Sequence, residues 1–125
     1  EPVSTAETST STSGRWQAWS EVRVQQALTA GQMVLVDYTA AWCITCQYNK
    51  KTVLSDARVL AAMDAARVLS LRADWTRRDP AITASLNALG RNGVPVYVVW
   101  APGQPPRLLS EIPTVQELVE ALDRH

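Results

Sequence analysis

The sequence predicts an α/β fold in which a central mixed β-sheet carries helices on both faces. Apolar runs that are typical of strands alternate with segments of helical periodicity along most of the chain. This order is typical of parallel strands joined by helices. Near the C-terminus, two strand-like runs flank a turn rich in Pro and Gly at residues 102–105, which predicts an antiparallel hairpin.

Length and composition suit one domain with one hydrophobic core. The chain has 125 residues, of which 46% are hydrophobic. Lys+Arg and Asp+Glu each number 12, so the formal net charge is +0 and nothing indicates nucleic acid or an anionic membrane as a partner. No apolar run approaches the roughly 20 residues of a membrane-spanning helix.

Residues 1–14 are mostly Ser, Thr, Ala and Glu, without apolar periodicity. We expect a flexible tether here, because such a segment cannot bury enough apolar surface to offset the entropy of ordering it. A linker to another domain is favoured over an artificial chain end. The chain begins at Glu1 without a secretory signal pattern, so we expect a processed or excised piece of a longer protein. The folded domain is expected over residues 15–125.

Three strands and two helices are predicted in the first half of the domain. In chain order they are an edge strand at 16–19, a helix at 20–30, a central strand at 33–39, a helix at 43–54 that continues after a break to 65, and a strand at 67–73. Ser20 is a favourable N-cap, and Gly31 ends the first helix. The pair Ser55-Asp56 provides the break in the second helix.

The second half is predicted to hold a helix, a hairpin and a last helix. In chain order the elements are a helix at 79–90, a strand at 94–101, its hairpin partner at 107–112 and a helix at 114–122. Asp79 caps the first of these helices, with Pro80 at its first helical position. Thr114 and Glu117 match the spacing of a capping box at the start of the last helix.

The only two cysteines, Cys43 and Cys46, are separated by two residues directly after the predicted central strand. This spacing lets both sulfurs meet at the start of a helix and alternate between dithiol and disulfide. Unpaired N–H groups and the helix dipole would lower the pKa of Cys43, which makes it the expected nucleophile. Cys46 lies one turn further on and is the expected resolving thiol.

Inert core cysteines and a zinc site are weaker interpretations of this pair. A structural zinc site needs four ligands, and the only histidine, His125, is at the chain end. We therefore expect no metal and no cofactor at the site.

Asp37 lies in the middle of the apolar central strand, six residues before Cys43. A carboxyl at this position should point under the active site, where burial would raise its pKa. It would then be suited to accept a proton from Cys46 or donate one to it. A strand residue that faces the surface is the alternative.

The tripeptide Gly93-Val94-Pro95 places a proline at the start of an otherwise strong strand, which is unusual. A cis peptide between Val94 and Pro95 would explain it. Such a turn beside the cysteines would leave the Val94 backbone free to pair with an incoming peptide. An ordinary trans proline at a strand edge is the alternative.

Trp42, Ile44 and Thr45 flank the cysteines and, with Val94 and Pro95, are the candidate substrate-binding residues. Ile44 and Thr45 carry neither a ring nor a charge that would tune the sulfurs, so the dipeptide does not indicate the direction of electron flow. Trp42 either shields one side of the site or simply packs.

Trp75 and the two arginines at 77 and 78 follow the strand predicted at 67–73. The arginines either contact a partner or, as we favour, belong to a solvated loop.

The segment 37–46 resembles the active-site segment of the thioredoxin superfamily, and Gly93-Val94-Pro95 resembles its cis-proline loop. The resemblance covers about residues 15–122 and implies a thioredoxin fold. Within the superfamily, the chain most resembles the C-terminal periplasmic domain of the DsbD family of thiol:disulfide interchange proteins. The features that carry this resemblance are the dipeptide between the cysteines, the segments 52–56 and 72–82, and the Ser/Thr-rich start.

The resemblance implies a protein-disulfide reductase without a cofactor, in which Cys43 attacks, Cys46 resolves and Asp37 is the buried acid. In that family the domain receives electrons from a transmembrane domain and passes them to an N-terminal periplasmic domain or another disulfide-bearing periplasmic protein. The chain would thus be a monomeric periplasmic domain of a bacterial inner-membrane protein, with a role in cytochrome c biogenesis and no contact with nucleic acid.

One position departs from the family pattern. DsbD domains can carry a second acid four residues beyond the second cysteine, and that position here is Lys50. A lysine near the sulfurs would favour the thiolate, which indicates a thiol oxidase or isomerase as the alternative function. A Cu(I)-binding module that uses both thiolates is a weaker alternative.

Overall fold

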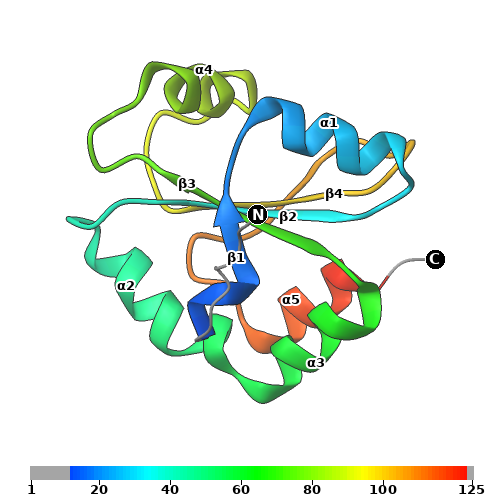
Figure 1. Ribbon diagram of the computed structural model, residues 1–125. Coiled ribbons are helices and arrows are strands. Elements are labelled where there is room, and N and C mark those ends of the chain that lie inside the picture. The colour runs from blue at the N-terminus through cyan, green and yellow to red at the C-terminus, as the bar shows by residue number, and fades with distance from the viewer. Residues whose placement is uncertain (1–11, 124–125) are drawn as a thin grey trace, which may run out of the picture.

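The computed structural model describes residues 12–123. They form a mixed five-stranded sheet in the order β1-β3-β2-β4-β5. Helices α1 and α4 cover one face of the sheet, and α2, α3 and α5 lie on the other (Figure 1). The predicted fold class is therefore confirmed. Residues 1–11 of the predicted tether, and His125, lie outside the described residues. The last residues of that segment, 12–14, belong to a short 3-10 helix, Thr12–Arg15. Because residues 1–11 are not described, the tether and its boundary at residue 14 stay predictions.

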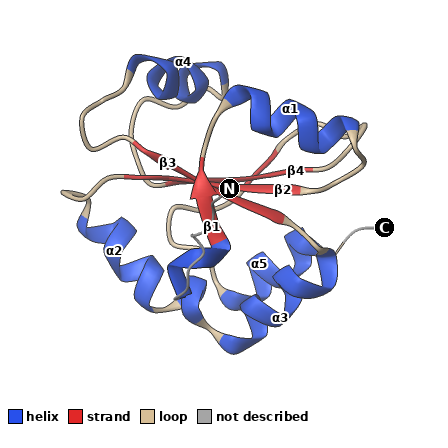
Figure 2. Cartoon of the chain, in the orientation of Figure 1, coloured by secondary structure: helices blue, strands red, loops and turns tan. Residues whose placement is uncertain are grey.

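The strands appear red in Figure 2 and are β1 (Trp16–Ala18), β2 (Val34–Thr39), β3 (Leu69–Asp74), β4 (Val96–Trp100) and β5 (Arg107–Leu108). As predicted, β1 and β2 are parallel to β3, whereas β4 is antiparallel to β2 and β5. The hairpin partner is shorter than the predicted 107–112. The N–H of Leu109 still donates to Tyr97 O at 2.9 Å, but that of Ser110 donates to the Glu117 carboxylate instead, so the chain leaves the sheet there.

The helices are α1 (Glu21–Thr29), α2 (Ile44–Lys51), α3 (Ala57–Ala66), α4 (Pro80–Ala88) and α5 (Val115–Leu122). The N-caps predicted at Ser20, Asp79 and Thr114 are confirmed. The capping box is only half formed, because the Glu117 carboxylate binds the N–H and hydroxyl of Ser110 rather than the Thr114 N–H.

Helix α2 ends at Lys51 rather than near Leu54, and a 3-10 turn, Val53–Ser55, follows it. Thr52 leaves helical geometry at φ −109° and ψ −89°. Its hydroxyl donates to Tyr48 O at 2.8 Å, a local bond that competes with helix continuation.

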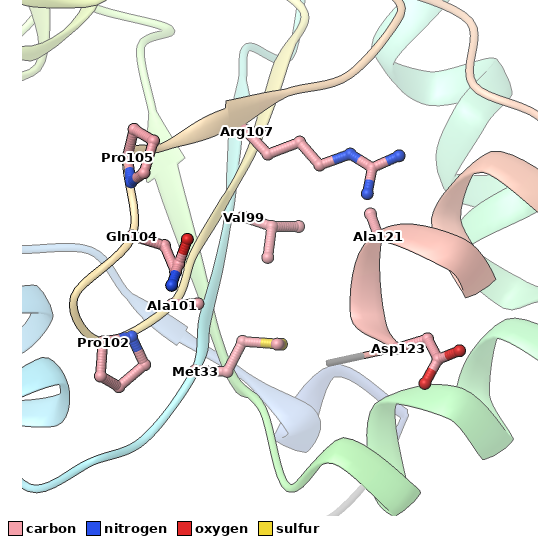
Figure 3. A pocket seen from close by; sticks show the side chains of 9 residues that line it. All are labelled: Met33, Val99, Ala101, Pro102, Gln104, Pro105, Arg107, Ala121 and Asp123. Carbon is pink, nitrogen blue, oxygen red and sulfur yellow. The ribbon is translucent and has the colours of Figure 1, made fainter. Parts of the chain in front are cut away.

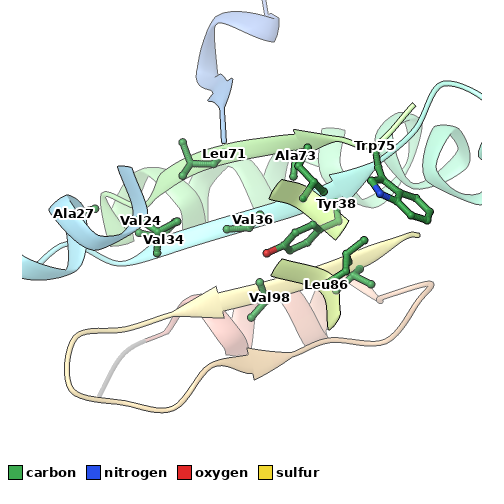
Figure 4. Packing of buried hydrophobic residues seen from close by; sticks show 12 residues of the cluster. Val24, Ala27, Val34, Val36, Tyr38, Leu71, Ala73, Trp75, Leu86 and Val98 are labelled. Atoms are coloured by element: carbon green, nitrogen blue, oxygen red, sulfur yellow. The ribbon is translucent and has the colours of Figure 1, made fainter. Parts of the chain in front are cut away.

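Two hydrophobic clusters pack against opposite faces of the sheet. Val34, Val36 and Tyr38 of β2 face α1 and α4, as Figure 4 shows for this cluster. Leu35 and the preceding Met33 face α3 and α5. All six residues of β2 are buried, which makes it the central strand, and the burial of apolar surface on both sides holds it in place. The loop that follows β2 and leads to Cys43 therefore begins at the end of a fully buried strand.

Candidate active site

Cys43 and Cys46 form a disulfide at the N-terminus of α2, with 5.2 Å between their Cα atoms. Cys43 is the N-cap of the helix, and its Sγ accepts the N–H of Cys46 at 3.1 Å. The two residues differ in exposure, since Cys43 is 8% exposed and Cys46 is fully buried. The less buried of the two cysteines therefore lies where helix N–H groups stabilise negative charge.

The loop between β2 and α2 is short and held at one carbonyl. The oxygen of Ala40 accepts the Cys43 N–H at 3.2 Å and the Gln47 side-chain amide at 3.0 Å. Ala40 packs with both cysteines in a small buried cluster, and Val94 packs against it. These contacts fix the start of α2 to the end of the central strand.

The peptide bond between Val94 and Pro95 is cis, which confirms the sequence prediction. Val94 lies against the disulfide cluster, while β4 begins only at Val96. Neither the N–H nor the carbonyl of Val94 makes a backbone hydrogen bond within residues 12–123. The structure thus brings the proline loop and the cysteines together and leaves the Val94 backbone unpaired.

Asp37 is fully buried, which rules out the surface-facing alternative. Its Oδ2 accepts the Nε–H of Arg72 at 2.9 Å, whereas its Oδ1 has no partner among the described residues. Desolvation raises the pKa of Asp37 above its ordinary value. The hydrogen bond and charge of Arg72, and the charge of Lys50, offset part of this increase.

The position of Asp37 beneath α2 follows from the alternation of the strands. Asp37 is paired in register with Tyr97 of β4, whose side chain lies on the face that carries Leu35. The Tyr97 hydroxyl accepts the side-chain amide of Asn49, a buried residue of α2, at 2.9 Å. Burial, and next the charge of Asp37, raise the pKa of Tyr97. Asp37 therefore lies under the helix that carries Cys46.

Sequence reasoning did not identify Arg72, Trp16 or Asn49 as parts of this site. The guanidinium of Arg72 lies 4.4 Å from the ring centroid of Trp16 while it binds Asp37. The presence of an arginine within the otherwise apolar strand predicted at 67–73 could have identified Arg72 as a candidate partner of a buried acid. Asn49 follows Cys46 by three residues, so the helical period already placed it on the same buried face.

Lys50 is half-buried on α2, and its pKa is lowered by desolvation and next by the positive charge of Arg72. The charges of Asp37 and Asp74 act in the opposite direction. An open pocket of about 450 Å³ is lined by Trp16, Lys50 and Arg72, among others. The two basic neighbours of the buried Asp37 carboxyl thus reach solvent-accessible space, although Asp37 itself does not line the pocket.

Trp42 both packs and remains exposed. Its ring lies against that of Trp75, with centroids 6.0 Å apart, and its Nε1 donates to Thr76 O at 3.0 Å, yet the residue is 48% exposed. Ile44 is 85% exposed and Thr45 is half-buried. The residues that flank the cysteines therefore present an accessible surface.

A pocket of about 380 Å³ opens at the other end of the sheet (Figure 3). It lies between Met33, just before β2, Arg107 of β5 and Ala121 of α5. The cysteines follow the opposite end of β2, so this pocket does not belong to the redox site.

Residues 12–123 carry neither a metal-binding cluster nor a membrane-spanning helix. They hold no group of three or more His, Cys, Asp or Glu side chains arranged to bind a metal ion. Nor does this part of the chain include a helix long and apolar enough to cross a membrane.

Comparison with known proteins relates this geometry to one family. The family model described as thioredoxin-like matches residues 15–102. The chain is 37% identical over 98 residues to the thiol:disulfide interchange protein DsbD 1 of Pseudomonas aeruginosa, covering 74% of this chain and 16% of the relative. It is 33% identical over 77 residues to DsbD of Ralstonia nicotianae, covering 62% of this chain and 12% of the relative. The chain thus spans a sixth or less of the length of these relatives.

Solved structures agree with the fold. The reduced C-terminal domain of DsbD from Neisseria meningitidis superposes with a TM-score of 0.66 at 23% identity, covering 82% of this chain and 94% of that one. The oxidised form of the same domain gives a TM-score of 0.67 at 22% identity, with coverages of 83% and 95%. At these identities the likeness shows the shared architecture.

Proposed function

Because the chain belongs to the thioredoxin-like family, we propose that it is a protein-disulfide reductase domain that relays electrons by dithiol/disulfide exchange. The likeness to thiol:disulfide interchange proteins and the cysteine pair in this fold support a thiol-disulfide oxidoreductase. We propose in addition that electrons pass from this domain to the disulfide of a partner protein, and we propose the partners below.

The unequal exposure of the two sulfurs carries the proposal. Exchange in two steps needs one thiolate that a partner can reach and a second that only the first sulfur meets. Cys43 is 8% exposed at the positive end of α2, and Cys46 is fully buried within disulfide distance of it. Inert core cysteines would need neither the cap position nor the exposure of Cys43.

The reaction proceeds through a mixed disulfide. In the dithiol form, the Cys43 thiolate attacks one sulfur of the partner disulfide, and the partner's other sulfur leaves as a thiolate. The Cys46 thiolate then attacks Cys43 Sγ, which closes the Cys43–Cys46 disulfide and releases the second partner thiolate. The partner gains two electrons and the domain loses two. A dithiol donor must then return them.

Asp37 acts as the proton acceptor for Cys46 in this proposal. A buried thiol must lose its proton before it attacks, and burial, which raises the pKa of Asp37, makes its carboxylate a stronger base than an exposed one. Its Oδ1 is free of hydrogen-bond partners among the described residues, while Arg72 orients Oδ2.

A partner segment would dock across the exposed residues around Cys43. Trp42, Ile44 and Thr45 supply the apolar surface, and the unpaired Val94 backbone next to Pro95 supplies hydrogen-bonding groups for an extended peptide. Main-chain pairing of this kind tolerates many sequences, as a relay between proteins requires.

The proposed donor is a membrane-embedded domain of a DsbD-like protein, and the proposed acceptor is a disulfide-bearing periplasmic protein or an N-terminal DsbD-like domain. The relatives named as thiol:disulfide interchange proteins support this assignment. A periplasmic location and a role in cytochrome c biogenesis belong to the same proposal.

The reduction potential of the Cys43–Cys46 pair tests the direction. Equilibration with a glutathione or dithiothreitol buffer should give a value of roughly −230 mV or below, towards that of thioredoxin. A value near −120 mV would overturn the reductase direction and favour the thiol oxidase that Lys50 suggests.

A further inference from the structure

Two tryptophan rings hold a cation at the rim of the candidate site. The guanidinium carbon of Arg78 lies 4.9 Å from the ring centroid of Trp42 and 5.1 Å from that of Trp75. The rings are inclined at 53° to each other, so the guanidinium contacts both. Aromatic faces attract a guanidinium through their quadrupole. Arg78 is thus held against the residue that directly precedes Cys43.

The loop that carries Arg78 is fastened to the loop that carries the cysteines. Trp42 Nε1 donates to Thr76 O at 3.0 Å, and Ala41 N donates to Thr76 Oγ1 at 2.8 Å. The N–H of Arg78 closes a turn onto Trp75 O at 2.9 Å, with Arg78 in the left-handed region at φ 53°. Because the cation is already ordered, binding a partner there costs little further conformational entropy.

The N–H edges of this guanidinium are available. Arg78 is exposed and makes no ion pair or side-chain hydrogen bond within residues 12–123. The acids nearest in sequence are engaged elsewhere, since Asp79 caps α4 and Asp74 accepts from Thr76. A guanidinium that stacks through its faces keeps its planar fork free for a carboxylate.

The two exposed acids of this rim, Asp74 and Asp79, are each engaged in a local hydrogen bond. Ile44 is apolar and 85% exposed, and Arg77, beside Arg78, is also exposed. Arg78 is therefore the cation of this rim whose guanidinium is fixed by the two rings and carries no carboxylate partner among the described residues.

We infer that Arg78 binds a carboxylate of the partner protein, so that the domain prefers disulfides with Asp or Glu beside the cysteine that Cys43 attacks. This inference rests on the proposed function and adds the chemical class of its substrates. Electrostatic complementarity of this kind acts mainly on the rate of encounter and on docking register. It would therefore affect formation of the mixed disulfide, the step in which the partner's sulfur leaves as a thiolate.

Two peptides that differ in one residue test the inference. They share a single intramolecular disulfide and carry either Asp or Asn directly before the first cysteine. The protein is reduced with dithiothreitol, freed of it, and mixed with each peptide at low salt. We expect the Asp peptide to react about fivefold faster, the size of one exposed charge pair.

Variants separate charge recognition from a structural role. Arg78→Gln should bring the ratio of the two rates close to one, Arg78→Glu should invert it, and Arg78→Lys should retain part of it. Arg107→Gln, at the opposite end of the sheet, is the matched control and should leave the ratio unchanged. Added salt should lower the ratio for the unaltered protein.

The outcomes are distinct. If the unaltered protein reduced both peptides at the same rate, the inference would fail while the proposed function stood. If Arg78→Gln slowed both peptides and kept the ratio, Arg78 would only position Trp42, and the inference would again fail. If neither peptide were reduced, the proposed function would fail and the inference with it.

Discussion

Arg72 and Asp37 lie opposite each other on adjacent parallel strands and share a hydrogen bond of 2.9 Å between Nε and Oδ2. The carboxyl is fully buried, whereas the arginine side chain is 26% exposed and lies over the Trp16 ring. The strand register therefore supplies a partial counter-charge beneath α2. Desolvation still dominates, so the pKa of Asp37 stays above its ordinary value.

Asp37→Asn should stabilise the protein at neutral and alkaline pH. Because desolvation raises the folded-state pKa of Asp37 above its unfolded value, the protonated form favours folding, and this stability is lost as pH rises through the folded pKa. The variant has no such loss. Urea unfolding of the disulfide form across a pH series should show similar stabilities below the ordinary pKa and a growing advantage for Asn above it. A difference that did not change with pH would contradict the raised pKa.

Lys50→Glu should shift the pH dependence of the resolving step upward. The Lys50 charge lowers the pKa of Asp37, so replacing Lys50 by an acid raises that pKa further. Asp37 can accept a proton only when it is ionised, and in the variant it becomes ionised at higher pH. Release of product from the mixed disulfide, followed by stopped flow, measures this step. Lys51→Glu adds the same charge change at the exposed neighbour and should move the profile much less. Equal shifts for both variants would argue against Asp37 as the base.

Cys46→Ser should trap the partner, whereas Cys43→Ser should not. Without the buried thiol, the mixed disulfide on Cys43 cannot resolve, so a covalent adduct accumulates with any reactive disulfide. Without Cys43, the remaining thiol at Cys46 is fully buried and should react at least about 100-fold more slowly. Non-reducing gels and mass spectrometry distinguish the two. Adducts on the Cys43→Ser variant at a comparable rate would reverse the assigned roles.

Asn49→Ala should destabilise the protein by about 2–3 kcal/mol. The Asn49 amide donates to the buried Tyr97 hydroxyl at 2.9 Å and to Glu111 O at 2.8 Å, so its removal leaves both acceptors without this donor and opens a small cavity. Tyr97→Phe removes only one of these bonds and should cost about 1 kcal/mol. Urea unfolding of both variants and of the unaltered protein measures the loss in free energy of unfolding for each. If Tyr97→Phe cost as much as Asn49→Ala, the bond to Glu111 would contribute nothing.

The local elements of the site were predictable because their signals lie close together in the sequence. The apolar run of β2 followed by Cys43 and Cys46 is a strand, a short loop and a helix start, and each depends on residues a few positions apart. The burial of Asp37 followed from its apolar neighbours in the same strand. The N-caps, such as Ser20, are local in the same sense.

Contacts between distant segments were not predictable in this way. The two arginines after β3 were expected in a solvated loop, and Arg78 is indeed exposed, but the sequence gives no sign that Trp42 lies against it. The carboxylate of Glu117 was expected at Thr114 and instead binds Ser110, because the chain returns past the start of α5 when it leaves the sheet.

By itself, then, the sequence determined the order of strands and helices, the redox pair at a helix start and the buried acid before it, since periodicity, caps and spacing act over one or two turns of chain. Only the tertiary structure decided which groups meet that acid and that pair. The parallel register of β2 and β3 selects Arg72 for Asp37, and the packing of the loop after β3 on the cysteine loop brings Arg78 to Trp42. Such pairings depend on the packing of whole elements in the core, which local sequence signals do not encode.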